Sequence, residues 1–248
     1  MSEKRTTEIL EALLNGQKDD AVNKFGYNND VDTTGSEDMW SAGGLYPCST
    51  FTTAQSLELL SSATADEVTT GTGAWAVRIN GLDENKEDKT IEVDLDGTTA
   101  VAIPGTWLAI NRANILEPSG TGGKNAGIIS IRVAGGGTVV SEIPLGRGQT
   151  QQCVYRVPSG KTLRVVNVIA YTDASTGKTG SMQLVRIGND CKTLRVLSSG
   201  TITETSRWER EYKVGGPEIE AGAWVLVRAL SVAQNDTSIT ADFDGLLE

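Results

Sequence analysis

The chain has 248 residues, 38% of them hydrophobic, and a formal net charge of −10. This length suits one large or two small domains with a sizeable core. The complete absence of histidine excludes Ser-His-Asp and Cys-His catalysis as well as histidine-ligated zinc. The opening MSEKRTTEIL lacks the apolar core of a secretory signal, and no stretch approaches the roughly 18 apolar residues of a membrane helix. We therefore expect a soluble, unprocessed chain with no membrane partner.

Residues 3–15 carry the one strong helical pattern of the sequence, and Asn15-Gly16 provides its stop signal. A helix of about three turns is marginal alone, so it needs a surface to cover its apolar face. Two surfaces stay open at this point, its own domain and a neighbouring subunit. The apolar face consists of Ile9, Leu10, Leu13 and Leu14.

Residues 26–47 are acidic, rich in glycine and aperiodic, yet they contain several large side chains that a disordered linker would rarely keep. We expect an ordered, extended arm whose aromatic residues anchor on a surface, either the chain's own or a partner's. Residues 1–47 thus form a predicted helix and assembly arm. The residues expected to bind a partner are Ile9, Leu10, Leu13, Leu14, Phe25, Met39, Trp40 and Tyr46.

Residues 48–137 are predicted to form a first β-sandwich, because the hydrophobic period changes to two. In TIEVDLDG, apolar side chains alternate with Glu92, Asp94 and Asp96, which is typical of a half-exposed antiparallel strand. GAWAVRINGL and the segment around Ile129 and Ile131 repeat the scheme. Glycine-containing turn signals separate these segments, as in a sandwich or barrel.

The triple glycine at residues 135–137 is the predicted boundary, and residues 138–248 are expected to form a second, jelly-roll-like β-sandwich. The segment LRVVNVIAY is apolar on both faces, which indicates a central strand or a second packing surface and favours a homo-oligomer. The expected strands are Cys153–Val157, Leu163–Thr172, Met182–Ile187, Thr193–Leu197, Trp208–Val214, Ala223–Leu230 and Ile239–Phe243.

The candidate metal and catalytic motifs are weak. Residues 83–94 match part of a calcium loop but carry Asp88 where glycine is required, so a solvated hairpin turn explains them better. A looser divalent site in the arm, made of Asp30, Asp32 and Asp38, is weighed against a plain acidic surface. Carboxylate pairs such as Glu209 with Glu211, or Asp242 with Asp244, would suit a glycosidase only at a spacing that the sequence does not reveal.

The distribution of basic residues and cysteines bears on possible partners and cofactors. Residues 25–77 contain no lysine or arginine, and no basic cluster appears elsewhere, so no nucleic-acid partner is expected. Cys48, Cys153 and Cys191 lie far apart without a CxxC spacing, which predicts scattered free thiols rather than a zinc site or a disulfide framework. We expect no metal, no cofactor and no enzymatic activity.

An ordered series of short motifs resembles a block found in virion structural proteins of tailed bacteriophages. The resemblance covers residues 25–137 well, and the C-terminal part more loosely. Asp96 stands where such proteins often carry Asn, and Ala100 where Pro is common; neither difference changes a chemical role. The motifs are Gly43-Gly44-Leu45-Tyr46-Pro47, Ser61-Ser62-Ala63-Thr64-Ala65-Asp66, Gly71-Thr72-Gly73-Ala74, Gly81-Leu82-Asp83, Asp96-Gly97-Thr98-Thr99-Ala100-Val101 and Asn111-Arg112-Ala113.

The resemblance implies an accessory virion protein that is synthesised in the host cytoplasm and assembles with itself and with major capsid or tail proteins. A capsid decoration protein or head fibre is favoured, because the N-terminal helix and acidic arm suit a tether. The close alternative is a tail adaptor, baseplate or receptor-binding component. A polysaccharide-degrading virion enzyme is a distant third.

Overall fold

In a computed structural model, the chain is described over residues 21–116, 124–173, 177–212 and 215–248. This part is almost entirely antiparallel β-structure, which confirms the predicted mainly β class. Its helical content is one short 3-10 segment, η1 (Cys48–Thr52). The helix predicted over residues 3–15 lies outside the described residues. No helix in the described ranges has the length and apolar character needed to cross a membrane.

The first sandwich is built from two antiparallel sheets, with strand orders β6-β3-β8-β9 and β5-β4-β7. The predicted alternation is confirmed, because Val77, Ile79 and Val93 are buried while Glu92 and Asp94 are exposed. Its strands are β3 (Gln55–Ser61), β4 (Ala76–Leu82), β5 (Asp88–Asp94), β6 (Val101–Trp107), β7 (Ala109–Ile115), β8 (Ile129–Val133) and β9 (Val139–Ile143).

The triple glycine lies inside this first sandwich rather than between the two sandwiches. It turns the chain from β8 into β9, and these two strands pair with each other. Gly135 and Gly136 have φ values of 84° and 78°, a left-handed conformation that glycine adopts without steric cost. Their N–H groups donate to the Glu58 carboxylate at 3.0 Å, which closes the turn on β3. The chain enters the second sandwich only after β9.

The second sandwich has two five-stranded sheets. One has the order β1-β17-β11-β14 with β15 beside β11, and the other has the order β10-β16-β12-β13 with β2 beside β16. Each of the seven strands expected in the C-terminal region has a counterpart, although the one expected over Trp208–Val214 ends at Glu211. Strand β11 lies between β17 and β14, which is the central position that was one of its two expected roles. The strands are β1 (Ala21–Val31), β2 (Glu37–Asp38), β10 (Val154–Arg156), β11 (Leu163–Thr172), β12 (Thr179–Ile187), β13 (Leu194–Thr203), β14 (Trp208–Glu211), β15 (Glu218–Ile219), β16 (Trp224–Val232) and β17 (Thr237–Leu247).

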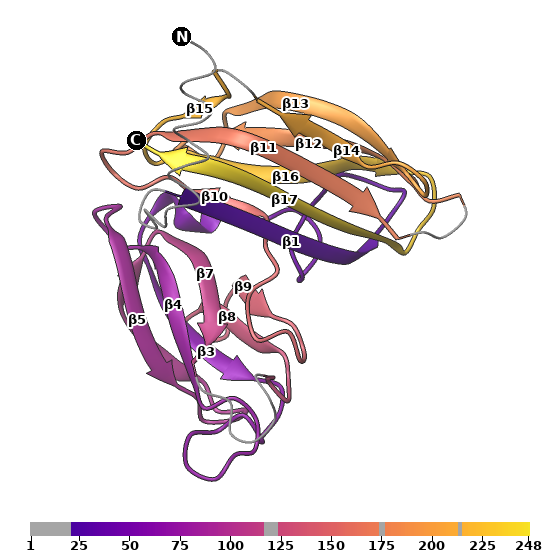
Figure 1. The fold of residues 1–248 in the computed structure, drawn as a ribbon. Coiled ribbons are helices and arrows are strands. Elements are labelled where there is room, and N and C mark those ends of the chain that lie inside the picture. Colours follow the sequence, from indigo (N-terminus) through magenta and orange to yellow (C-terminus); the bar gives the residue numbers. More distant parts are fainter. Residues whose placement is uncertain (1–20, 117–123, 174–176, 213–214) are drawn as a thin grey trace.

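The described part of the expected arm, residues 21–47, belongs to this second sandwich. Strand β1 pairs with β17 from Ala21 to Val31 with one register shift, so it supplies an edge strand of the first five-stranded sheet. Strand β2 adds to the edge of β16. Figure 1 shows β1 lying along β17 on the side that faces the first sandwich. The second sandwich is therefore built from both ends of the described chain.

Figure 1 shows where the two sandwiches meet. They share one hydrophobic cluster there. Strand β16 is apolar on both faces: Val225 and Val227 face the interior of the second sandwich, whereas Trp224 and Leu226 join the core of the first. The segment that crosses from β2 of the second sandwich to β3 of the first contributes Phe51, whose ring centroid lies 5.9 Å from that of Trp224. This continuous burial fixes the junction as part of the folded core.

Candidate functional site

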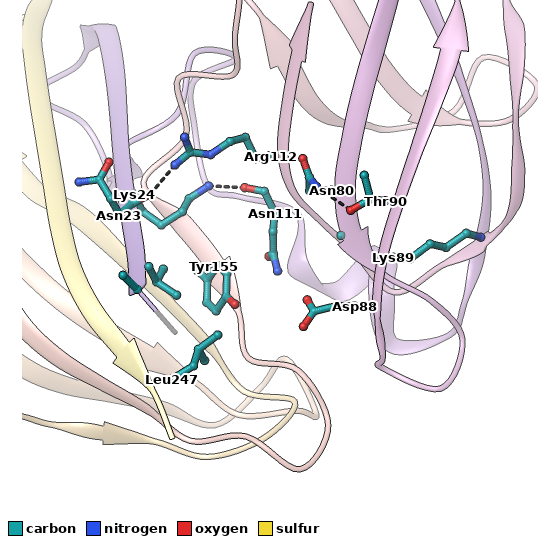
Figure 2. Close-up of a pocket in the computed structure, with 13 residues that line it drawn as sticks. Asn23, Lys24, Asn80, Asp88, Lys89, Thr90, Asn111, Arg112, Tyr155 and Leu247 are labelled. Atoms are coloured by element: carbon teal, nitrogen blue, oxygen red, sulfur yellow. Dashed lines mark hydrogen bonds between the residues drawn. The ribbon is translucent and has the colours of Figure 1, made fainter. Parts of the chain in front are cut away.

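A cleft of about 500 Å³ lies between the two sandwiches (Figure 2). One wall comes from β1, β10 and β17 of the second sandwich, and the other comes from β4, β5 and β7 of the first. The polar side chains on the walls are Asn23, Lys24, Asn80, Asp88, Lys89, Thr90, Asn111, Arg112 and Tyr155.

Lys24 is buried in the cleft wall, with 3% of its surface exposed. Its ammonium group donates to the backbone carbonyl of Asn111, across the junction. Burial, followed by the charge of the neighbouring Arg112 guanidinium, lowers the pKa of Lys24 to about 7. The side chain therefore sits near the balance between its charged and neutral forms at neutral pH.

Arg112 approaches from the opposite wall and donates to the backbone carbonyl of Asn23. Figure 2 shows its guanidinium and the Lys24 ammonium directed toward each other's strands. Within the described ranges, neither cation has a carboxylate at ion-pair distance. Asp88 lies elsewhere on the wall, and burial raises its pKa, with Glu87 acting in the same sense. Two neighbouring cations with backbone carbonyls rather than carboxylates as acceptors favour an anionic group in the cleft.

The candidate calcium ligands are only partly brought together. Asp30 and Asp32 meet Asp236, with one carboxylate oxygen of each within 4.8 Å of the others. A hydrogen bond to Asp236 is the main cause that raises the pKa of Asp30. Asp38 instead lies in the interior and pairs with Arg228 at 2.6 and 3.0 Å. An exposed acidic cluster of this kind is common without an ion.

The turn between β4 and β5 is the solvated hairpin that the sequence favoured over a calcium loop. The strands pair through Leu82 and Asp88. The Asp83 carboxylate accepts the N–H groups of Asn85 and Glu87 at 2.8 and 2.9 Å, so it is engaged in closing the turn.

The carboxylates weighed for glycoside hydrolysis lie on the sheet that contains β17, β11 and β14. Asp242 and Glu209 are both register partners of Ile169, one on each side of it. Two strand spacings put their backbones roughly 10 Å apart. Burial, followed by the charges of Asp244 and Glu209, raises the pKa of Asp242 to about 6.

The structure places the described members of the expected partner-binding set in the chain itself. Met39, Trp40 and Tyr46 are buried, with at most 5% of their surface exposed, and Phe25 is partly buried on β1. The Tyr46 ring centroid lies 5.2 Å from that of Trp40 and 5.5 Å from that of Trp224. This arrangement corresponds to the alternative in which the aromatic residues anchor on the chain's own surface. Ile9, Leu10, Leu13 and Leu14 lie outside the described residues.

Sequence reasoning missed the cleft, because its cations come from separate strands. The available signal was the inward position of Lys24, which shares the buried face of β1 with Val22 and Gly26. A lysine at an inward strand position needs a specific acceptor or a pocket. That signal was visible only after residues 21–31 were known to be a strand.

Comparisons with known proteins add little to this picture. No family model matches the chain, and no curated protein sequence matches it. The structure of the infectious bursal disease virus Gx strain aligns with a TM-score of 0.26 at 10% identity, covering 92% of this chain and 71% of that one. A crystal structure of the T13 viral particle of the same virus gives a TM-score of 0.24 at 11% identity, with coverages of 99% and 76%. TM-scores of this size do not establish a common fold.

Proposed function

We propose that the chain is a non-enzymatic structural protein of a tailed-bacteriophage virion, placed on the capsid as a decoration or head-fibre subunit and assembling through protein–protein contacts. The ordered motifs from Gly43 to Ala113 support the virion assignment. The structural observation that carries the assembly role is an exposed apolar strand at the end of the β10-β16-β12-β13 sheet.

Strand β13 is the last strand of that sheet. Leu194 and Val196 lie directly opposite Ile187 and Val185 of β12, so each pair points to the same face. Ile187 and Val185 are buried in the junction cluster, whereas Leu194 and Val196 are 47% and 42% exposed. On this face, the apolar side chains of β12 are buried, whereas those of the neighbouring strand β13 are exposed to solvent. An exposed apolar edge strand is a typical association surface.

The association step is tested by measuring the mass of the purified chain by light scattering over a range of concentrations. We expect a homo-oligomer, and Val196→Lys should shift it toward monomer, because a lysine on a strand edge disfavours edge contacts. Leu145→Lys is the matched control, since Leu145 is 62% exposed in the turn after β9. A monomeric wild-type chain, or equal effects of both variants, would contradict this surface.

The virion assignment is tested in particles of the virus that encodes the chain. Mass spectrometry of purified particles should detect it, and its density in a particle reconstruction should lie on the capsid exterior. Density in the tail would replace the decoration role by the adaptor, baseplate or receptor-binding alternative. Absence from particles would overturn the virion assignment, and turnover of a polysaccharide panel would overturn the non-enzymatic role.

A further inference from the structure

Two of the three cysteines, far apart in the sequence, meet beside the junction of the sandwiches. Cys48 begins η1, and Cys191 lies in the turn between β12 and β13. The Cys191 thiol donates to the backbone oxygen of Cys48 at 3.0 Å, and each cysteine side chain shifts the pKa of the other. Cys48 is buried, whereas Cys191 is partly exposed. Both are free thiols.

The turn that carries Cys191 is held in place on both sides. The Asp190 carboxylate accepts the N–H groups of Lys192 and Thr193 at 3.0 Å. The Asn189 side-chain oxygen accepts a hydrogen bond from Arg156 at 2.7 Å, which ties the turn to the junction. These contacts keep the Cys191 sulfur next to Cys48 rather than free in solvent.

The surroundings favour the thiolate of Cys191. The hydrogen bond from the Cys48 thiol lowers the pKa of Cys191 to about 7, and the Arg156 charge and the Trp224 indole act in the same direction. Trp224 Nε1 is buried without a hydrogen-bond acceptor among the described residues. Arg156 is 1% exposed and has no carboxylate partner in the described part of the chain. The pKa of Cys48 is raised, because its thiol is the donor of the pair and is also desolvated.

We propose that Cys48 and Cys191 form an intramolecular disulfide by exchange with a small disulfide such as oxidised glutathione. The Cys191 thiolate attacks one glutathione sulfur, the glutathione S–S bond breaks, and one glutathione thiolate leaves. Cys48 then loses its proton to solvent and attacks the Cys191 sulfur, which expels the second glutathione thiolate. The two protein thiols are oxidised, and one glutathione disulfide is reduced to two glutathione thiols.

The bond would join the segment that crosses between the sandwiches to a hairpin of the second sandwich. It would close a loop of more than a hundred residues, which reduces the entropy of the unfolded chain. For a chain of this size we expect the Tm of the oxidised form to exceed that of the reduced form by about 5–10 °C. The thiol pair is thus a redox-controlled lock on the junction.

The test treats the full-length, reduced chain with oxidised glutathione at pH 7.5, then blocks the remaining thiols and maps the peptides by mass spectrometry. We expect a linked Cys48–Cys191 peptide pair and an unmodified Cys153. Cys153 is the internal control, because it is fully buried and burial raises its pKa. A stable glutathione adduct on wild-type Cys191, a bond between two chains, or no reaction would overturn the proposal.

Two variants separate the roles of the sulfurs. Cys48→Ser should accumulate the mixed disulfide at Cys191, because the second thiol is missing. Cys191→Ser should leave Cys48 unreacted, and both variants should lose the rise in Tm. Equal reactivity of Cys48 in the Cys191→Ser variant would show that Cys191 is not the attacking thiol. If either variant fails to fold, peptide mapping of the wild-type chain still decides whether the bond forms.

Discussion

The junction between the two sandwiches buries a cation on each of its two sides, and the two sides treat their cations differently. On the side that contains the Trp224 ring, Arg156 donates to three backbone oxygens at 2.6–3.1 Å and to the side chain of Asn189. The three backbone oxygens are those of Phe51, Leu108 and Gly222. On the cleft side, Lys24 has one carbonyl acceptor. Neither cation has a carboxylate partner within the described residues.

The difference shows that the number of acceptors decides whether a buried cation holds a structure together. The planar guanidinium spreads its charge over several fixed acceptors that belong to both sandwiches, and it lies 5.0 Å from the Trp224 ring centroid. The single acceptor of Lys24 does not compensate for the loss of water, which is why its pKa falls to about 7. Arg156 therefore joins the sandwiches through several acceptors, whereas Lys24 joins them through a single carbonyl and is left poorly compensated for its burial.

The largest expected effect is at Arg156. Arg156→Met keeps an apolar stem of similar length but leaves the carbonyls of Phe51, Leu108 and Gly222 without their donor. Because each buried unpaired carbonyl is expensive, we expect the free energy of unfolding to fall by about 3–5 kcal/mol. Denaturant unfolding measures the change.

Arg78→Met is the matched control for this prediction. Arg78 pairs with Glu92 at 2.7 Å, but both side chains are about half exposed. An exposed ion pair of this kind contributes little, so the loss should stay below about 0.5 kcal/mol. Similar losses in the two variants would show that the junction does not depend on the acceptors of Arg156.

Lys24→Met tests the other side of the junction through pH. The folded-state pKa of Lys24 lies near 7 and the unfolded value near 10.5, so the unfolded chain binds more protons in between. The stability of the wild type should therefore rise, relative to the variant, by roughly 2 kcal/mol between pH 7 and pH 9. Paired unfolding curves at each pH measure this difference. A difference that stays constant with pH would mean that Lys24 remains charged, for example because an anion occupies the cleft.

Strands such as β4, β5 and β8 were predictable, because their apolar residues alternate with a period of two. Strand β1 was not, since its inward positions include Lys24, Gly26 and Asn28 rather than apolar residues. The triple glycine predicted a boundary, although the same residues suit a tight hairpin turn equally well. Local patterns do not distinguish a turn from a linker, because that depends on whether the strands on either side pair.

The functional features depended still more on tertiary contacts. Cys48 and Cys191 are scattered in the sequence and adjacent in space, and no spacing rule for cysteines connects them. Asp236 joins Asp30 and Asp32 from the far end of the chain, whereas Asp38 turns inward to Arg228. Trp40 and Tyr46 are buried because they pack in the hydrophobic cluster that the two sandwiches share. The acidic, aperiodic sequence around them gave no sign of that position.

The smallest expected effect is at Asp242, a charge that is only partly buried on β17. Its folded-state pKa of about 6 exceeds the unfolded value of 3.8, so the folded chain binds more protons between these values. The stability of the wild type should therefore fall, relative to Asp242→Asn, as pH rises from 4 to 6. Solvent screens a half-exposed carboxylate, and the difference should reach about 1 kcal/mol at most. Paired Tm measurements across this range detect it, with Asp94→Asn, at an exposed position of β5, as the control. If the stability difference for Asp242 were as large as the one predicted for Lys24, a half-buried charge would cost as much as a fully buried one. The number of hydrogen-bond acceptors would then not explain why Arg156 and Lys24 behave differently at the junction.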